Sequence, residues 1–310
     1  SGPPPGQTWD EVRLESAGKS LELERAFVEY GGDRSFCQQP LEHGRLYAPA
    51  SWYRGFCRML RQLPPDLAYH NSPSEIEVLF DKRQTHQRLT RAGLPVAPSL
   101  GPVSTYQELR QALEREGVDR AFLKVFCGSS CSGSVAYLKG DEVCFTTVER
   151  AANGRYYNSR RVRRYSGQVA AEIIDWLGGQ GLQAEVWLPK ARLQGLPFDL
   201  RLVTIAGQVC HRVMRQGHTP MLGLHLGSRR GDLQALDRWL GERARARVDE
   251  LARAVATLFP GCLYLGIDLL IRPDKTPVVI EVNAFGDLLP GVLWQGMDTY
   301  TAELLARNSA

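Results

Sequence analysis

Apolar and polar residues alternate along the chain with two different periods, and each period predicts a different kind of element. Helices are expected where apolar residues recur every three or four positions, or where caps, glycines and prolines mark the ends: 21–30, 51–63, 75–92, 109–116, 169–177 and 233–258. Strands are expected in short runs rich in β-branched and aromatic residues: 12–14, 121–126, 134–138, 143–148, 182–188, 200–206, 208–214, 264–271 and 277–282. Hairpins combined with packed helices indicate an α+β fold.

The composition is that of an ordinary globular protein. The 310 residues are 43% hydrophobic and 23% charged, which suits one large or two ordinary domains. No apolar run reaches the ~18 residues that span a bilayer, and the polar start 1–6 carries no secretory signal. We therefore expect a cytoplasmic protein without a membrane partner. The net charge of +4 permits an anionic substrate and does not demand nucleic acid.

Seven cysteines are scattered along the chain without a C-x-x-C pair. An odd number at irregular spacing argues against a disulfide framework and against a zinc site. Free thiols in a reducing compartment are expected at Cys37, Cys57, Cys127, Cys131, Cys144, Cys210 and Cys262.

Three oxygen-bearing side chains lie on two strands that a turn at 272–275 connects. Glu281 and Asn283 share one face of their strand, because alternate residues point the same way. Asp268 lies among apolar residues of the other strand, where a carboxylate is costly unless it is paired. Pairing of the strands would gather two carboxylates and a carboxamide, a ligand set suited to Mg²⁺ shared with phosphate. The alternative is three polar residues at strand ends, each satisfied by backbone. Ile280 and Val282 are expected to point into apolar packing.

Two lysines and a glycine-serine loop are candidates for holding phosphate. Lys82 lies within the helix expected over 75–92, and Lys124 ends an apolar strand just before the loop 127–134. Glycine and serine leave room for backbone N–H groups to approach phosphate oxygens, and lysine supplies a point charge. The pattern of a Walker loop is absent. The alternative for the loop is a plain hairpin turn.

The order of these segments resembles the ATP-grasp carboxylate–amine ligases, with the RimK-like glutamate ligases nearest in pattern. The resemblance covers about residues 71–295. It rests on 71–73, 81–83, 93–96, Lys124 with 128–133, 185–187, 199–201, Arg215, Asp268 and 281–283.

The resemblance implies an ATP-grasp fold, in which two α+β subdomains grip ATP. It places a lid subdomain at about 95–185 and a Mg–ATP subdomain at about 186–310, within an ATP-grasp domain of 71–310. Residues 1–70 would be a short or remodelled N-terminal domain.

The resemblance also implies a role for each matching residue. Phosphates would be held by Lys82 and Lys124. The loop would close over them with Gly128, Ser129, Ser130, Ser132 and Gly133. The hinge beside adenine would be Glu185, Val186, Trp187 and Leu188, with backbone groups of Val186 and Trp187 reading the base, and Asp199 on the nucleotide side. Asp268, Glu281 and Asn283 would bind Mg²⁺, with Mn²⁺ as the alternative metal. Arg215 would stabilise the transferred phosphoryl group, with Arg201 and His225 as further catalytic candidates.

The implied activity is formation of an amide from a carboxylate and an amine through an acyl phosphate. The substrates would be small molecules or peptides, acidic or phosphorylated ones included. Two alternatives stay open: a kinase on the same scaffold, and an ATP-binding module without chemistry. The sequence also leaves an oligomer open.

The segment 155–165 packs five arginines and three tyrosines together. One interpretation is recognition of an acidic or phosphorylated substrate by guanidinium groups. A second is stacking of nucleic-acid bases on arginine and tyrosine. The third is a solvated helix face, which charge runs usually form.

Overall fold

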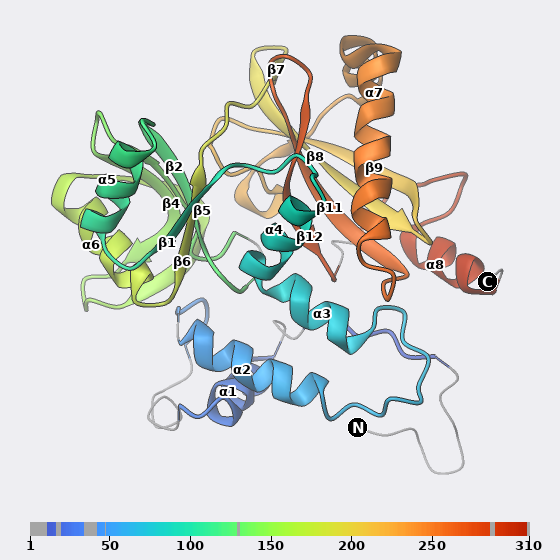
Figure 1. The fold of residues 1–310 in the computed structure, drawn as a ribbon, viewed down its shortest axis with the longest axis horizontal. Helices are drawn as coiled ribbons and strands as arrows, with labels where there is room; N and C mark the ends of the chain where they lie inside the picture. The colour runs from blue at the N-terminus through green and yellow to red at the C-terminus, as the bar shows by residue number, and fades with distance from the viewer. Residues whose placement is uncertain are drawn as a thin grey trace.

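The computed structural model describes residues 11–16, 20–33, 42–46, 48–128, 131–285 and 289–308. Two antiparallel sheets stand side by side, and helices cover their outer faces (Figure 1). The first sheet has the strand order β1-β6-β2-β3-β4-β5. Its strands are β1 (Ser99–Val103), β2 (Arg120–Val125), β3 (Val135–Leu138), β4 (Val143–Arg150), β5 (Tyr156–Ser166) and β6 (Leu182–Val186).

The second sheet has the order β10-β9-β8-β11-β12, and β7 pairs with β8. Its strands are β7 (Arg192–Leu193), β8 (Leu196–Ile205), β9 (Gln208–Gln216), β10 (Arg229–Arg230), β11 (Tyr264–Ile271) and β12 (Pro277–Asn283). The helices are α1 (Leu21–Tyr30), α2 (Pro49–Leu60), α3 (Pro73–Phe80), α4 (Lys82–Arg91), α5 (Tyr106–Arg115), α6 (Gly167–Gly178), α7 (Leu233–Thr257), α8 (Thr299–Asn308) and the 3₁₀ helix η2 (Leu224–Leu226).

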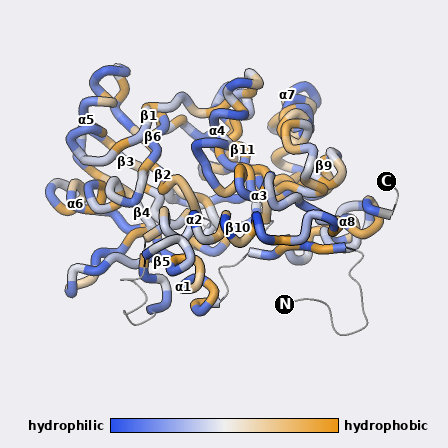
Figure 2. Tube along the Cα trace, turned by 60° about the horizontal axis from the view of Figure 1, so that its bottom comes forward, coloured by the Kyte–Doolittle hydropathy of each residue, from blue (hydrophilic) through white to orange (hydrophobic). Residues whose placement is uncertain are grey.

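Each sheet buries one face against helices. In the first sheet, Leu123 of β2 packs with Leu109 of α5 and Ile173 of α6 in one core. In the second sheet, Leu269 packs with Val248 of α7. The tube in Figure 2 changes between hydrophilic and hydrophobic colours within single turns of α7, as expected for a helix that buries one stripe. Because side chains alternate across a strand, both sheets present their remaining faces to a shared cleft.

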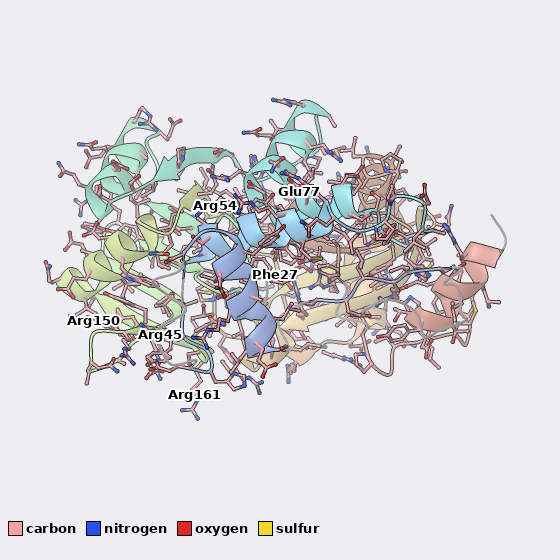
Figure 3. All side chains as sticks on the ribbon, turned by 90° about the horizontal axis from the view of Figure 1, so that it is seen from below. Phe27, Arg45, Arg54, Glu77, Arg150 and Arg161 are labelled. Atoms are coloured by element: carbon pink, nitrogen blue, oxygen red, sulfur yellow. The ribbon has the colours of Figure 1, made fainter. Side chains whose placement is uncertain are left out.

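The paired helices α1 and α2 lie below the sheets in Figure 1 and join the core of the second sheet through Phe27 and Phe56. Phe27 lies where α1 meets α2 (Figure 3) and makes edge-on ring contacts with Trp52 and Phe56. Gly55 permits this close approach, since a Cβ atom there would lie 1.9 Å from the Phe27 carbonyl oxygen.

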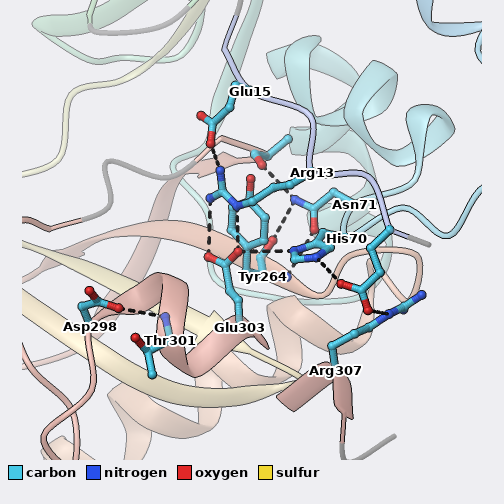
Figure 4. A network of polar contacts seen from close by, with 11 residues as sticks. Arg13, Glu15, His70, Asn71, Tyr264, Asp298, Thr301, Glu303 and Arg307 are labelled. Carbon is cyan, nitrogen blue, oxygen red and sulfur yellow. Dashed lines mark hydrogen bonds and ion pairs between the residues drawn. The ribbon is translucent and has the colours of Figure 1, made fainter. Parts of the chain in front are cut away.

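A polar network ties the N-terminal segment to α8 (Figure 4). Arg13 donates from Nε to Glu303 at 2.8 Å, and its guanidinium lies over the Tyr264 ring at 4.5 Å from the centroid. His70 lies 3.1 Å from Glu11. These contacts fix residues 11–16 against β11 and α8.

Most of the expected elements are confirmed, with four differences. The strand expected over 12–14 is wrong, because this segment makes only an isolated bridge from Val12 to Tyr69. The helix expected over 75–92 is wrong: it is two helices, because Asp81 adopts extended backbone (φ −92°, ψ 101°) and caps α4 through the backbone N–H of Arg83. The interpretation of 155–165 as a helix face is also wrong, since the segment lies in β5 and pairs with β4. The elements β1, β5, β7, β10, η2 and α8 were not expected. Along the described part of the chain, none of the helices is both long and apolar enough to cross a membrane.

Candidate active site

One pocket lies between the two sheets and gathers most of the residues that the sequence singles out. The first sheet and its loops contribute Lys124, Ser132, Glu185, Val186, Trp187 and Leu188; the second contributes Asp199, Arg201, Arg215, His225, Asp268, Glu281 and Asn283; α4 contributes Lys82. Side chains more than 150 positions apart in sequence therefore face one space.

Lys82 reaches the pocket because α3 and α4 are separate helices. Its backbone N–H donates to Phe126 at 2.8 Å, which fixes the start of α4 beside the end of β2. Its Nζ lies 2.8 Å from Glu281 Oε1 and donates to the Gly128 carbonyl at 2.6 Å. The lysine thus sits between the loop that follows β2 and the carboxylate of β12.

Lys124 connects the two sheets. Its Nζ donates to Glu185 Oε2 at 2.8 Å within the first sheet and to the Ile280 carbonyl at 2.8 Å on the second. Both Lys124 and Glu185 are buried, so their charges are only weakly screened.

The two carboxylates of the second sheet lie directly opposite each other, since Asp268 pairs with Glu281 in the β11–β12 ladder. Asn283 pairs with Gly266. A Cβ atom at Gly266 would lie 2.8 Å from Arg201 Nη1, so glycine leaves room for the Arg201 guanidinium at this position. A register shift follows Asp268, because Leu269 pairs with Val279 and leaves Ile280 as an extra residue. The expectation that Ile280 points into apolar packing is therefore wrong, as Ile280 lines the pocket, whereas Val282 is buried in the core.

Two arginines neutralise this carboxylate cluster. Arg201 Nε and Arg215 Nη2 each lie 3.1 Å from Asp268 Oδ1. Arg215 Nε also donates to Asp199 Oδ1 at 2.7 Å. The second oxygen of Asp199 accepts from Lys190 at 2.8 Å. Asp199 is 1% exposed, so both of its oxygens serve to hold cations of the pocket wall.

The carboxyl groups differ in pKa for identifiable reasons. Burial raises the pKa of Glu281, but Lys82 outweighs burial, with help from Lys124 and Arg201, and brings it down to about 2. For Asp199, Arg215 and Lys190 likewise outweigh burial and lower the pKa. Burial dominates at Asp268 and raises its pKa despite Arg201 and Arg215. The neighbouring Glu281 raises it further, so additional positive charge would favour the ionised form of Asp268.

The residues present fit a divalent cation shared with a nucleotide. Asp268 Oδ1 and Arg201 Nη1 are buried polar atoms without a hydrogen-bond partner among the described residues. No group of three or more His, Cys, Asp or Glu side chains with metal-binding geometry occurs in the described part of the chain. Two carboxylates and one carboxamide leave coordination positions for phosphate and water, which is the usual arrangement for Mg²⁺ at ATP sites.

The structure also places the expected hinge and part of the glycine-serine loop. The N–H groups of Val186 and Trp187 already donate to Pro98 and Arg120, so only other backbone atoms of the hinge are available to a base. Gly133 does not line the pocket; a Cβ there would lie 2.5 Å from Val125 Cγ2. Ser129 and Ser130 lie outside the described residues, as does Cys37.

Some residues that line the pocket were not predicted from the sequence. Lys190 lies two residues after the expected hinge, and that position is the only signal that could have found it. Phe122, Met221 and Leu222 line the pocket with apolar side chains and carry no motif. The six described cysteines are free thiols, and Cys131 lines the pocket.

No protein-family model matches the sequence, and no curated protein is significantly similar to it. Solved structures do share its fold. D-cycloserine synthetase DcsG is similar with a TM-score of 0.55 at 16% identity, over 82% of this chain and 78% of that one. VanG D-Ala:D-Ser ligase from Enterococcus faecalis has a TM-score of 0.52 at 13% identity, over 78% and 65%. The ADP complex of PurK, an N5-carboxyaminoimidazole ribonucleotide synthetase, has a TM-score of 0.50 at 13% identity, over 74% and 51%.

The chain therefore has the ATP-grasp fold, in which two mixed helix–sheet units face each other across a cleft. It spans between about half and about four fifths of the length of these three proteins. At this level of identity, the comparison concerns the fold and leaves activity and substrates to be argued from the site.

Proposed function

We propose that the protein is an ATP-dependent ligase that joins a carboxylate to an amine through an acyl phosphate, with ATP and Mg²⁺ bound in the cleft. Within that class, the RimK-like ligases are the finer proposal, supported by the order of motifs from Asn71 to Asn283. The three solved proteins of similar fold support the class of reaction: one is named a ligase and two are named synthetases.

The observation that supports this proposal most is the charge distribution of one pocket. Lys82 and Lys124 lie on the side of the first sheet and α4, and Arg201 and Arg215 lie on the second sheet. Between them are Asp268 and Glu281, opposite each other on paired strands. With Lys190, Glu185 and Asp199, the pocket is lined by five cations and four carboxylates. Cations on both sides of Asp268 and Glu281 suit a polyphosphate that shares a divalent ion with those two carboxylates.

The residues would divide the work as follows. Lys82 and Lys124 would bind phosphate oxygens, and Asp268, Glu281 and Asn283 would hold the metal. Mg²⁺ supplies positive charge that offsets the charge developing on the phosphoryl oxygens. Arg215, held in place by Asp199, would stabilise the same charge from the other side.

In the first step, a substrate carboxylate oxygen attacks the γ-phosphorus, and the bond to the β,γ-bridging oxygen breaks to release ADP. In the second, the amine nitrogen attacks the acyl carbon. Phosphate then leaves with the former carboxylate oxygen, and the nitrogen loses a proton. The buried walls of the pocket would protect the acyl phosphate from water.

The test is a screen for ADP release against amino acids, peptides and acidic metabolites, in pairs of a carboxylate and an amine. A hit is repeated with ¹⁸O in the carboxylate, and the released phosphate is analysed by mass spectrometry. We expect ADP release to need both partners and ¹⁸O to enter the phosphate. Phosphate retained on an alcohol would instead identify a kinase, and ATP binding without turnover would identify a binding module.

A further inference from the structure

One set of alternate side chains on the arginine-rich strand β5 points to the same face of the first sheet as the residues that line the pocket. Residues paired across neighbouring strands point to the same side. The ladder pairs Glu185 with Phe122, Phe122 with Ala136, Ala136 with Phe145, and Phe145 with Arg164. Glu185 and Phe122 line the pocket, so Arg164 lies at the far end of a row that begins there. At about 4.8 Å per strand, Arg164 is about 14 Å from the strand of Phe122.

A matching row crosses the second sheet. Leu270 pairs with Asp199, Asp199 with Arg215, and Arg215 with Arg230 of the edge strand β10. The first three line the pocket, which places Arg230 on the pocket side, about one strand spacing beyond Arg215. Arg230 is exposed, and its Nη2 donates to the neutral Pro290 carbonyl at 2.7 Å.

The two rows end near the same element. Strand β5 contacts the 3₁₀ helix η2, and β10 begins three residues after η2. His225 of η2 lines the pocket. The outer end of the cleft is therefore bordered by β5 on one sheet, η2 in the middle and β10 on the other sheet, with Arg164 and Arg230 on the pocket side of their strands.

Part of the positive charge at this end has no carboxylate partner among the described residues. Arg155 pairs with Glu42, and Arg163 pairs with Glu149. Arg164 is exposed, and within the described ranges neither Arg164 nor Arg230 has a carboxylate partner. A planar guanidinium in this situation favours a carboxylate or phosphate group.

The tyrosines of β5 argue against nucleic acid as the occupant. Tyr156 stacks on Trp176 with ring centroids 4.1 Å apart. Tyr157 donates to Glu42, and Tyr165 packs against the core of the first sheet. Two of the three rings that would have to stack on bases are thus already in contact with the protein, and the third tyrosine is held through its hydroxyl.

We propose that Arg164 and Arg230 form a subsite for a second anionic group, a carboxylate or a phosphate, on the substrate whose first carboxylate reacts beside Arg215. This inference rests on the proposed function and narrows its substrate to acidic chains. The reacting group would lie among the cations of the pocket, and the second group would bind at the outer end of the same two rows.

The test measures binding rather than turnover, so it stands apart from the test of the proposed activity. The full chain with Mg²⁺ and the non-hydrolysable ATP analogue AMP-PNP is titrated calorimetrically with three peptides: oligoglutamate, the matched oligoglutamine, and that oligoglutamine with one phosphoserine. The variants are Arg164→Gln and Arg230→Gln. Arg245→Gln is the matched control, because Arg245 is an exposed arginine of α7. Arg161→Gln tests for a non-specific effect of the basic strand.

We expect at least one of the two anionic peptides to bind about tenfold more tightly than oligoglutamine. Arg164→Gln and Arg230→Gln should each weaken that binding about tenfold, as the loss of one charged hydrogen bond does. A preference for phosphoserine or for glutamate assigns the group as phosphate or carboxylate. Equal binding of all three peptides would overturn the inference. So would equal losses in Arg161→Gln and Arg245→Gln, or displacement of the peptide by an oligouridine.

Discussion

Replacing Asp199 by Asn tests the role that the structure gives this residue. Asp199 is buried between Arg215 Nε at 2.7 Å and Lys190 Nζ at 2.8 Å. Removing one partner of a buried ion pair costs about 3–5 kcal/mol, because the other charge stays buried. Asn keeps an acceptor for Arg215, which also retains Asp268 at 3.1 Å. We therefore place the loss in the free energy of unfolding near the lower end, at about 3 kcal/mol.

The same strand supplies a matched control. Arg212, three residues before Arg215 on β9, binds both oxygens of Asp237 at 2.9 and 2.6 Å. The side chains of that pair are 22% and 27% exposed. Asp237→Asn should therefore cost only about 0–1 kcal/mol, because solvent screens the pair. Each substitution removes one carboxylate charge that pairs with an arginine of β9, and the two pairs differ mainly in burial.

The assay is urea unfolding followed by tryptophan fluorescence, since urea does not screen charges as a salt does. With a slope of about 3 kcal/mol per molar for a chain of this size, Asp199→Asn should lower the midpoint by about 1 M. Asp237→Asn should lower it by at most about a third of that. Equal midpoints for the two variants would refute the reasoning that Asp199 holds the cations of the pocket wall.

Three further outcomes follow from the structure. Because the pKa of Asp199 is lowered in the folded state, its ionised carboxylate stabilises the fold above the ordinary carboxyl pKa, and this stability is lost as the pH falls from there through the lowered pKa. Acid titration should therefore destabilise the wild type more steeply than Asp199→Asn, and parallel curves would contradict this. Gly55→Ala should lower stability by about 1–3 kcal/mol, because its Cβ would meet the backbone of α1, whereas Gly140→Ala, with open space around it, should be nearly neutral in thermal unfolding. Lys124→Met should weaken ATP binding in calorimetry and lower the free energy of unfolding by about 3 kcal/mol, because it leaves Glu185 buried and unpaired. Adding Glu185→Gln should restore the stability but not the ATP affinity, and restoration of both would argue against a phosphate-binding role for Lys124.

The hairpin that carries Asp268 and Glu281 was predictable because it depends on local features. Alternation fixes which side chains share a face, and a short polar turn joins the strands. The structure pairs the two carboxylates directly. Ile280 was not predictable, because the extra residue that turns it into the pocket is a property of the register between two strands.

Long-range pairing explains the other differences. Aspartate is a favoured N-cap residue, but the sequence around Asp81 carries no glycine or proline that would end a helix there. The bridge of Asp81 to Cys127 is made across the fold. The run of arginines in β5 looks like a solvated face until its pairing with β4 shows which residues turn toward the cleft. The ion pair between Asp199 and Arg215 likewise depends on β8 and β9 lying side by side.

The central claim is that the cleft between the sheets binds Mg–ATP through the carboxylates of β11 and β12. Calorimetric titration of ATP into the wild type, Glu281→Gln and the exposed control Glu250→Gln, each with and without Mg²⁺, tests it most directly. We predict Mg²⁺-dependent binding in the wild type and in Glu250→Gln, and at least about tenfold weaker binding in Glu281→Gln. Binding by Glu281→Gln with the affinity and Mg²⁺ dependence of the wild type would contradict it.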